Sequence, residues 1–220
     1  LLDLQRSKAR MASLQEQITT GNRIVDVGDD PTGTSLVMNF QTSIDRNTQY
    51  LKQVNDAQGF LQDTETVVSS LNDQITQLMA LAQQGLGNST GATGRAALVS
   101  EVNGIRTSLI SMANTQEDGK YLFAGTKTLT QPFSDPSVAT TTYSGDGNTI
   151  SLDVSVGASV ATNVPGSTLF MPGGQGSSTD IFQTVSDLST ALANNDVTGI
   201  QTAANNLKTI LGNVNTVLTD

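Results

Sequence analysis

The sequence predicts an α+β protein, a discontinuous bundle of long helices with a small all-β domain inserted between its two parts. Apolar residues recur at three-and-four spacing before residue 118 and again after residue 178, which is the period of an amphipathic helix. Between these parts, residues 149–156 alternate between apolar and polar, as a half-buried strand does. We therefore expect a helical rod domain from residues 1–118 plus 178–220 and an inserted β domain with its connectors at 119–177.

The first predicted helix covers residues 1–20, and Gly21 is expected to end it because glycine readily adopts the left-handed C′ conformation. Asp30 and Pro31 should begin the second helix. Asp is a favoured N-cap, and the first helical position does not need the N–H that Pro lacks. The apolar stripe of the first helix consists of Leu4, Met11, Leu14 and Ile18.

The second predicted helix extends to about Gln84 and carries coiled-coil-like heptads. Long helices are rarely straight, so we expect a break or kink near its N-terminal end. Residues 85–94 are rich in Gly, Ser and Thr and should form a loop. From this helix, the predicted helical core contains Val54, Leu61, Val68, Leu71, Ile75 and Leu78.

Three further helices are expected. The first covers about residues 95–113, the second runs from Asp180 to about 193, and the third follows residues 194–196 and continues to the chain end. Asp180 is a good N-cap for the second of them. Ile200, Leu207 and Val214 should place the last helix in the core. Leu1 is not an initiator methionine and this last helix has no cap, so we expect the chain to be a fragment.

The β insert is expected to start with a short apolar strand at residues 121–124. Residues 140–143 and 149–156 should form two strands on either side of a turn. The insert is polar and rich in glycine, and we expect it to project outward. Deleting residues 134–171 should then have a milder effect than losing the whole protein.

Composition excludes several classes of function. Eleven basic against 20 acidic residues give a net charge of −9, which disfavours nucleic acid as a partner. The chain has no Cys and no His, so disulfides, thiolate metal sites and His-based catalytic constellations are impossible. No apolar run is long enough to span a membrane. We expect no catalytic residue, no metal, no cofactor and no membrane partner.

Three local patterns allow a functional and a structural interpretation. The Asp29-Asp30 pair could be catalytic, but acidic residues before a Pro are far more often a helix start. Asp146 and Asn148 resemble part of a calcium loop, yet they lack the full pattern and its distal Glu, and a turn is favoured. The glycines at 85–94 precede a helix without Gly-Lys-Ser/Thr, so a plain loop is favoured over a phosphate site.

Residues 20–24, Thr-Gly-Asn-Arg-Ile, followed by Asp29, Asp30 and Pro31, resemble the N-terminal region of the bacterial flagellin family. The segment at 119–128, Gly-Lys-Tyr-Leu-Phe-Ala-Gly-Thr-Lys-Thr, is similar to the hook-associated members rather than to filament flagellins. The resemblance spans essentially the whole chain. The family's paired terminal segments are not recognisable at either end.

The resemblance implies a structural flagellar subunit that is exported by the flagellar type III apparatus with a chaperone. Copies would form a ring beside a neighbouring hook-associated protein and filament flagellin. The family pattern places Arg23, Asp29, Asp30 and Pro31 at a contact between subunits. The alternatives are filament flagellin, a flagellin-like surface adhesin and an Asp/Glu carbohydrate-active enzyme.

Overall fold

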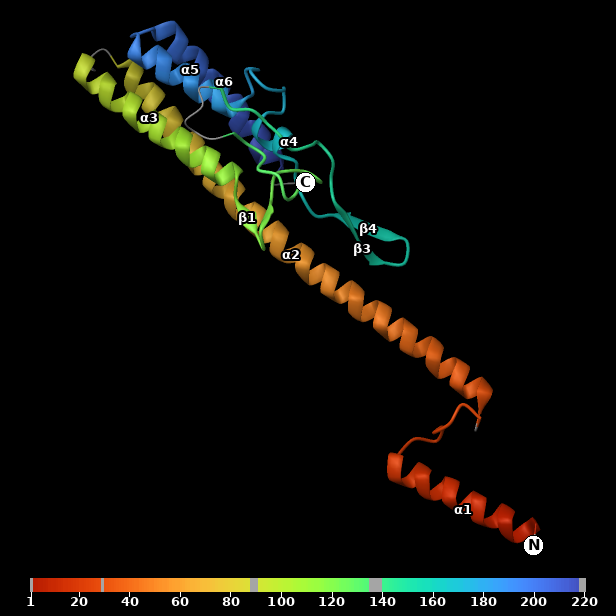
Figure 1. The fold of residues 1–220 in the computed structure, drawn as a ribbon. Helices are drawn as coiled ribbons and strands as arrows, with labels where there is room; N and C mark the ends of the chain where they lie inside the picture. Colours follow the sequence, from red (N-terminus) through yellow and green to blue (C-terminus); the bar gives the residue numbers. More distant parts are fainter. Residues whose placement is uncertain (1, 29, 88–90, 135–139, 218–220) are drawn as a thin grey trace. The chain divides into compact units, whose positions relative to one another are not determined.

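The computed structural model describes residues 2–28, 30–87, 91–134 and 140–217. The chain divides into two compact units, Leu1–Lys52 and Gln53–Asp220. The described residues are mainly helical and include two small two-stranded sheets (Figure 1). The predicted α+β class, a helical core with a small β region, is thus confirmed. The rod-and-insert domain boundaries stay a prediction.

Two helices meet at a short loop in the N-terminal unit. Helix α1 spans Leu2–Thr20, and Gly21 ends it with φ +70° while its N–H donates to the Gln17 carbonyl at 2.9 Å. Helix α2 spans Pro31–Leu86 as one uninterrupted helix of 56 residues. The predicted break is therefore absent. The predicted loop at 85–94 is shorter than expected, because Gly85 and Leu86 belong to α2 and residues 92–94 already belong to the next helix.

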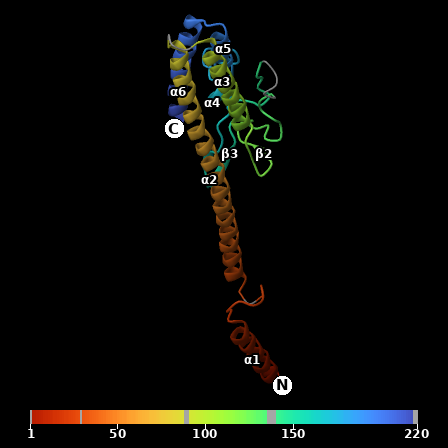
Figure 2. The same cartoon turned by 90° about the vertical axis from the view of Figure 1, so that its left-hand side faces the viewer.

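The second unit packs the later part of α2 with three other helices (Figure 2). These are α3, Ala92–Ala113, α5, Ile181–Ala193, and α6, Val197–Val217. Helix α5 packs against both α3 and α6. Ile200 lies beside Gly85, and Asn72 donates to Asn215 at 3.0 Å, so α6 runs antiparallel to α2.

The core of this unit is aliphatic, with an aromatic cluster at one end. Most of the predicted core residues are at most 1% exposed: Val68, Leu71, Ile75, Leu78, Ile200, Leu207 and Val214. Val54 is only half-buried and Leu61 is 40% exposed, so these two positions are not in the core. Val217, the last described residue of α6, lines the same groove as Leu61.

The insert differs in detail from the sequence prediction. Strands β1, Gln116–Glu117, and β2, Lys120–Tyr121, form a hairpin, and Leu122, Phe123 and Ala124 are buried without being a strand. Strand β3, Ser151–Ser155, pairs with β4, Ala158–Ala161, across a turn at Gly157. The partner of β3 therefore follows it in the chain, and the expected strand at 140–143 is limited to a bridge between Tyr143 and Phe133.

Aromatic side chains join the insert to the helices. Phe133 lies 5.2 Å from Phe182 of α5 and 5.2 Å from Phe170, measured between ring centroids. Phe170 belongs to a short helix, α4, at Gly166–Phe170, so the insert is not purely β. Because Leu169 and Phe170 are fully buried, the insert does not simply project outward as expected, and deleting residues 134–171 would open the core.

Candidate subunit-contact site

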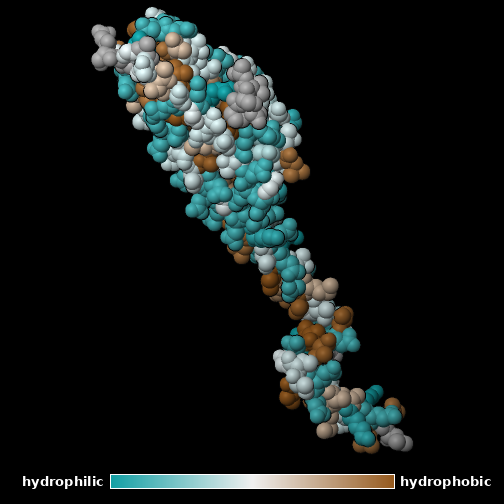
Figure 3. Space-filling view, turned by 60° about the vertical axis from the view of Figure 1, so that its left-hand side comes forward, coloured by the Kyte–Doolittle hydropathy of each residue, from teal (hydrophilic) through white to brown (hydrophobic). Residues whose placement is uncertain are grey.

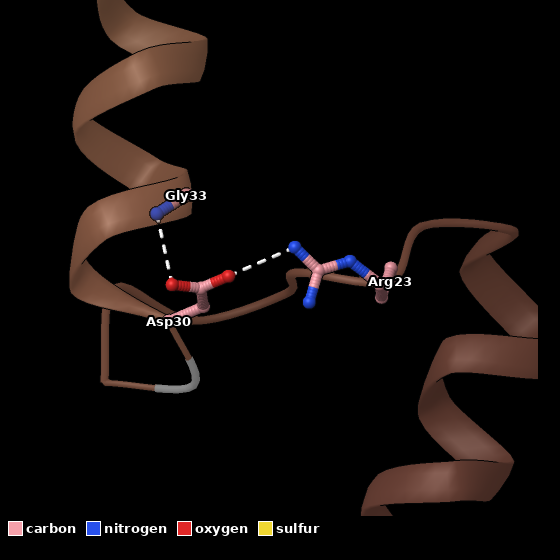
Figure 4. A network of polar contacts seen from close by, with 3 residues as sticks. All are labelled: Arg23, Asp30 and Gly33. Carbon is pink, nitrogen blue, oxygen red and sulfur yellow. Dashed lines mark hydrogen bonds and ion pairs between the residues drawn. The ribbon is translucent and has the colours of Figure 1, made fainter.

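The loop between α1 and α2 brings together three of the four residues predicted at a subunit contact, and Figure 4 shows two of them, Arg23 and Asp30, together with Gly33. Arg23 Nη2 donates to Asp30 Oδ2 at 2.8 Å, and Pro31 begins α2 directly after Asp30. Asp29 lies outside the described residues. The ion pair joins the two ends of the loop across seven residues.

Asp30 is the N-cap that the sequence predicted. Its Oδ1 accepts the Gly33 N–H at 2.8 Å, which satisfies one of the amides that a helix start leaves unpaired. The Gly33 hydrogen bond and then the Arg23 hydrogen bond lower the pKa of Asp30 below its ordinary 3.8. Asp30 is therefore a carboxylate at neutral pH and holds both groups as an acceptor.

Gly33 is a residue of this site that the sequence prediction missed. A Cβ at this position would lie 2.5 Å from Asp30 Oδ2 and 2.7 Å from Ile24 Cδ1, so a side chain would displace the cap. The sequence did contain a signal for it, because a glycine in the first turn of a helix lowers helix propensity. Such a glycine indicates a position where a side chain would not fit.

An open pocket of about 530 Å³ adjoins the ion pair. Arg23 stands at its edge with a side chain 73% exposed, so part of the guanidinium faces solvent. The walls combine apolar side chains with polar ones, among them the side chain of Asp26. The lining consists of residues 22–27 together with Thr34, Val37 and Met38.

Apolar side chains are exposed along the whole N-terminal unit (Figure 3). No residue of α1 is buried, and Ile18 is 83% exposed. Patches of this kind usually mark an interaction surface. In this unit the exposed large apolar residues are Leu2, Leu4, Met11, Leu14, Ile18, Val25, Val27, Leu36, Val37, Met38, Phe40, Ile44 and Leu51.

The net charge is divided unevenly between the units. Residues 1–52 hold 6 basic and 6 acidic residues, so their formal charge is zero. Residues 53–220 hold the remaining 5 basic and 14 acidic residues and therefore all of the net charge of −9. Copies can thus approach one another through the N-terminal unit without net repulsion.

The other candidate patterns have structural roles where the structure describes them. Asp146 accepts the Thr126 N–H at 2.8 Å and the Thr126 hydroxyl at 2.6 Å, and these bonds lower its pKa. It therefore fastens a turn. Among the described residues no cluster of acidic side chains is suited to hold a metal, and no helix is long and apolar enough to cross a membrane.

Comparisons with known proteins found matches over most of the chain. The model of the bacterial flagellin N-terminal helical region matches residues 1–128. Flagellar hook-associated protein 3 of Escherichia coli is 27% identical over 99% of this chain and 76% of its own length. The corresponding Salmonella typhimurium protein is 29% identical over 97% and 73%.

Two further matches show how far the likeness extends. Flagellin of Salmonella typhimurium is 26% identical, over only 69% of this chain and 29% of its own length. Among solved structures, a flagellar hook-associated protein from Vibrio parahaemolyticus superimposes with a TM-score of 0.78 at 21% identity, covering 88% of this chain and 87% of that one. That structure shows the same fold.

Proposed function

The chain belongs to the bacterial flagellin family through its N-terminal helical region, residues 1–128, and we propose that it is a structural subunit of the junction between hook and filament. The likeness to hook-associated protein 3 over nearly the whole of this chain carries the proposal. Flagellin matches a smaller part of the chain and less than a third of its own length, so filament flagellin is the weaker alternative.

The exposed apolar face of the N-terminal unit supports an assembly role. A helix such as α1, with no buried residue, gains most of its stability only when its apolar stripe packs against another surface. Copies arranged in a ring would cover this face. The loop that holds Arg23, Asp30 and Pro31 would then present a fixed geometry to the neighbouring copy.

The proposed partners on either side are a neighbouring hook-associated protein and filament flagellin. We further propose secretion through the flagellar type III apparatus with a chaperone, which a chain without cysteines suits, because no disulfide has to be reduced before threading. The helical rod domain, 1–118 plus 178–220, would carry the contacts along the tube. The matching relatives are structural proteins of the flagellum rather than enzymes.

Deletion of the gene tests the proposal. Cells without the subunit should still build hooks but release flagellin into the medium instead of growing filaments. A gene copy should restore filaments, and a tagged copy should be seen by electron microscopy at the hook end. Normal filaments in the deletion strain would refute the junction role, and an adhesin role would then lead. A tag along the whole filament would indicate flagellin instead.

A variant that lacks only the outer part of the insert tests whether this part is needed for assembly. No side chain of the β3–β4 hairpin, residues 151–161, is buried, and the buried part of the chain resumes at Thr162 and Asn163. Replacing residues 152–160 by a short Gly-Ser linker should leave the core intact and filaments present. This replacement takes the place of the broader deletion that the sequence suggested.

A further inference from the structure

The four helices of the second unit form two helical hairpins that are far apart in the chain. Helices α2 and α3 make one hairpin, and α5 and α6, joined by the short turn at 194–196, make the other. Both carry similar aliphatic repeats at three-and-four spacing. Repeats of this kind can also pack after a shift of one heptad, so apolar periodicity alone does not define how the two hairpins align.

One contact between the hairpins is specific to a single position. Gly85 is buried in the last turn of α2, and a Cβ built on it would collide with Leu192 Cδ2 of α5. The same Cβ would lie 3.6 Å from Ile200 Cδ1 of α6. Leu192 is itself fully buried, so its side chain occupies the space that every other residue type would fill at position 85.

No other position on the packed part of α2 offers this space. Between residues 60 and 86, Gly85 is the only glycine of α2, and the buried positions toward the N-terminus carry larger side chains, such as Leu78 one heptad away. A shift of the α5–α6 hairpin by one heptad in that direction would place Leu192 against Leu78. Overpacking of this sort is destabilising.

We propose that Gly85 and Leu192 form a steric key that sets the alignment of the α5–α6 hairpin on α2. The hydrogen bond from Asn72 to Asn215 at 3.0 Å holds the far end of α6 in the same alignment. The key concerns the folded chain itself, and its test does not depend on the role in the flagellum.

Paired glycine variants test the key by thermal unfolding. Gly104 lies on an exposed face of α3, and no atom is within 4 Å of a Cβ built there. Alanine is the better helix former at both sites, so Gly104→Ala should keep or raise Tm. Gly85→Ala should lower Tm by several degrees. In a Leu192→Ala background, the same Gly85→Ala change should lower Tm by less, because the side chain that collides with the added methyl is gone. Equal behaviour of Gly85→Ala and Gly104→Ala would overturn the proposal.

Spin labels read the alignment directly. The chain has no cysteine, so Thr76→Cys on α2 and Lys208→Cys on α6, both exposed, would carry the only two labels. We expect one narrow distance distribution in this background and with Gly104→Ala. Gly85→Ala should shift or broaden it, and adding Leu192→Ala should restore a distribution centred at the original distance. An unchanged distribution in Gly85→Ala would show that other contacts set the alignment.

Discussion

Truncation of Leu71 in α2 tests whether its apolar stripe is the core of the folded chain. Leu71 is 0% exposed, in the centre of the aliphatic cluster. Leu71→Ala removes three carbons, which accounts for about 2.4 kcal/mol at ~0.8 kcal/mol for each. The cavity left behind adds to this, and Leu→Ala changes in tight cores cost about 2.7–5.0 kcal/mol in all. We expect unfolding free energy to fall by about 3–4 kcal/mol.

Urea unfolding followed by circular dichroism at 222 nm would measure this loss, with Leu61→Ala as the matched control. Leu61 lies on the same helix and the same heptad pattern but is 40% exposed. Its truncation should cost less than about 1 kcal/mol, close to the range of surface substitutions. A loss below about 0.5 kcal/mol for Leu71→Ala, or equal losses for the two variants, would refute the assignment of the core.

Three other side chains give separate predictions. Asp180 is a buried N-cap that accepts the Phe182 and Gln183 amides. Asp180→Ala should lower the unfolding free energy by about 1–2 kcal/mol, as measured by urea titration. Burial, then Asp63 and Asp118, raises the pKa of Glu117 above its ordinary 4.5. Its contribution to stability is therefore present below 4.5 and is lost as the pH rises through the raised value, so Glu117→Gln should raise Tm at neutral pH with a gain that shrinks in acid. Asp30→Ala should speed amide hydrogen exchange in the first turn of α2, and unchanged exchange would contradict its capping role.

Local rules predicted three helix boundaries correctly, because the deciding interactions there lie within a few residues. Gly21 with φ +70° and the Asp30 and Asp180 caps are confirmed, since each depends only on backbone groups within three or four residues. The heptad pattern likewise indicated which face of α2 is apolar. It could not indicate which positions along that face are covered, and Leu61, which is 40% exposed, was wrongly placed in the core.

Pairings between distant segments were beyond the sequence patterns. The alternation in β3 predicted a strand, but two neighbouring segments could have paired with it, and the turn at Gly157 decided for β4. The buried position of Phe170 depends on contacts with Phe133 and Phe182, which no periodicity shows. At the candidate contact site, Asp30 and Pro31 were visible as a helix start, whereas the exclusion of a side chain at Gly33 required the folded loop.

The separation of apolar surface from charge bears on how the free chain behaves before assembly. The N-terminal unit has an exposed apolar surface and zero formal charge, so this unit alone should aggregate readily. The acidic second unit would keep the chain in solution, because the negative charges on two copies repel each other in dilute buffer. Salt shortens the reach of that repulsion to about 8 Å at physiological ionic strength. Colloidal stability of the free chain would then decline with added salt, while the attraction between apolar faces persists.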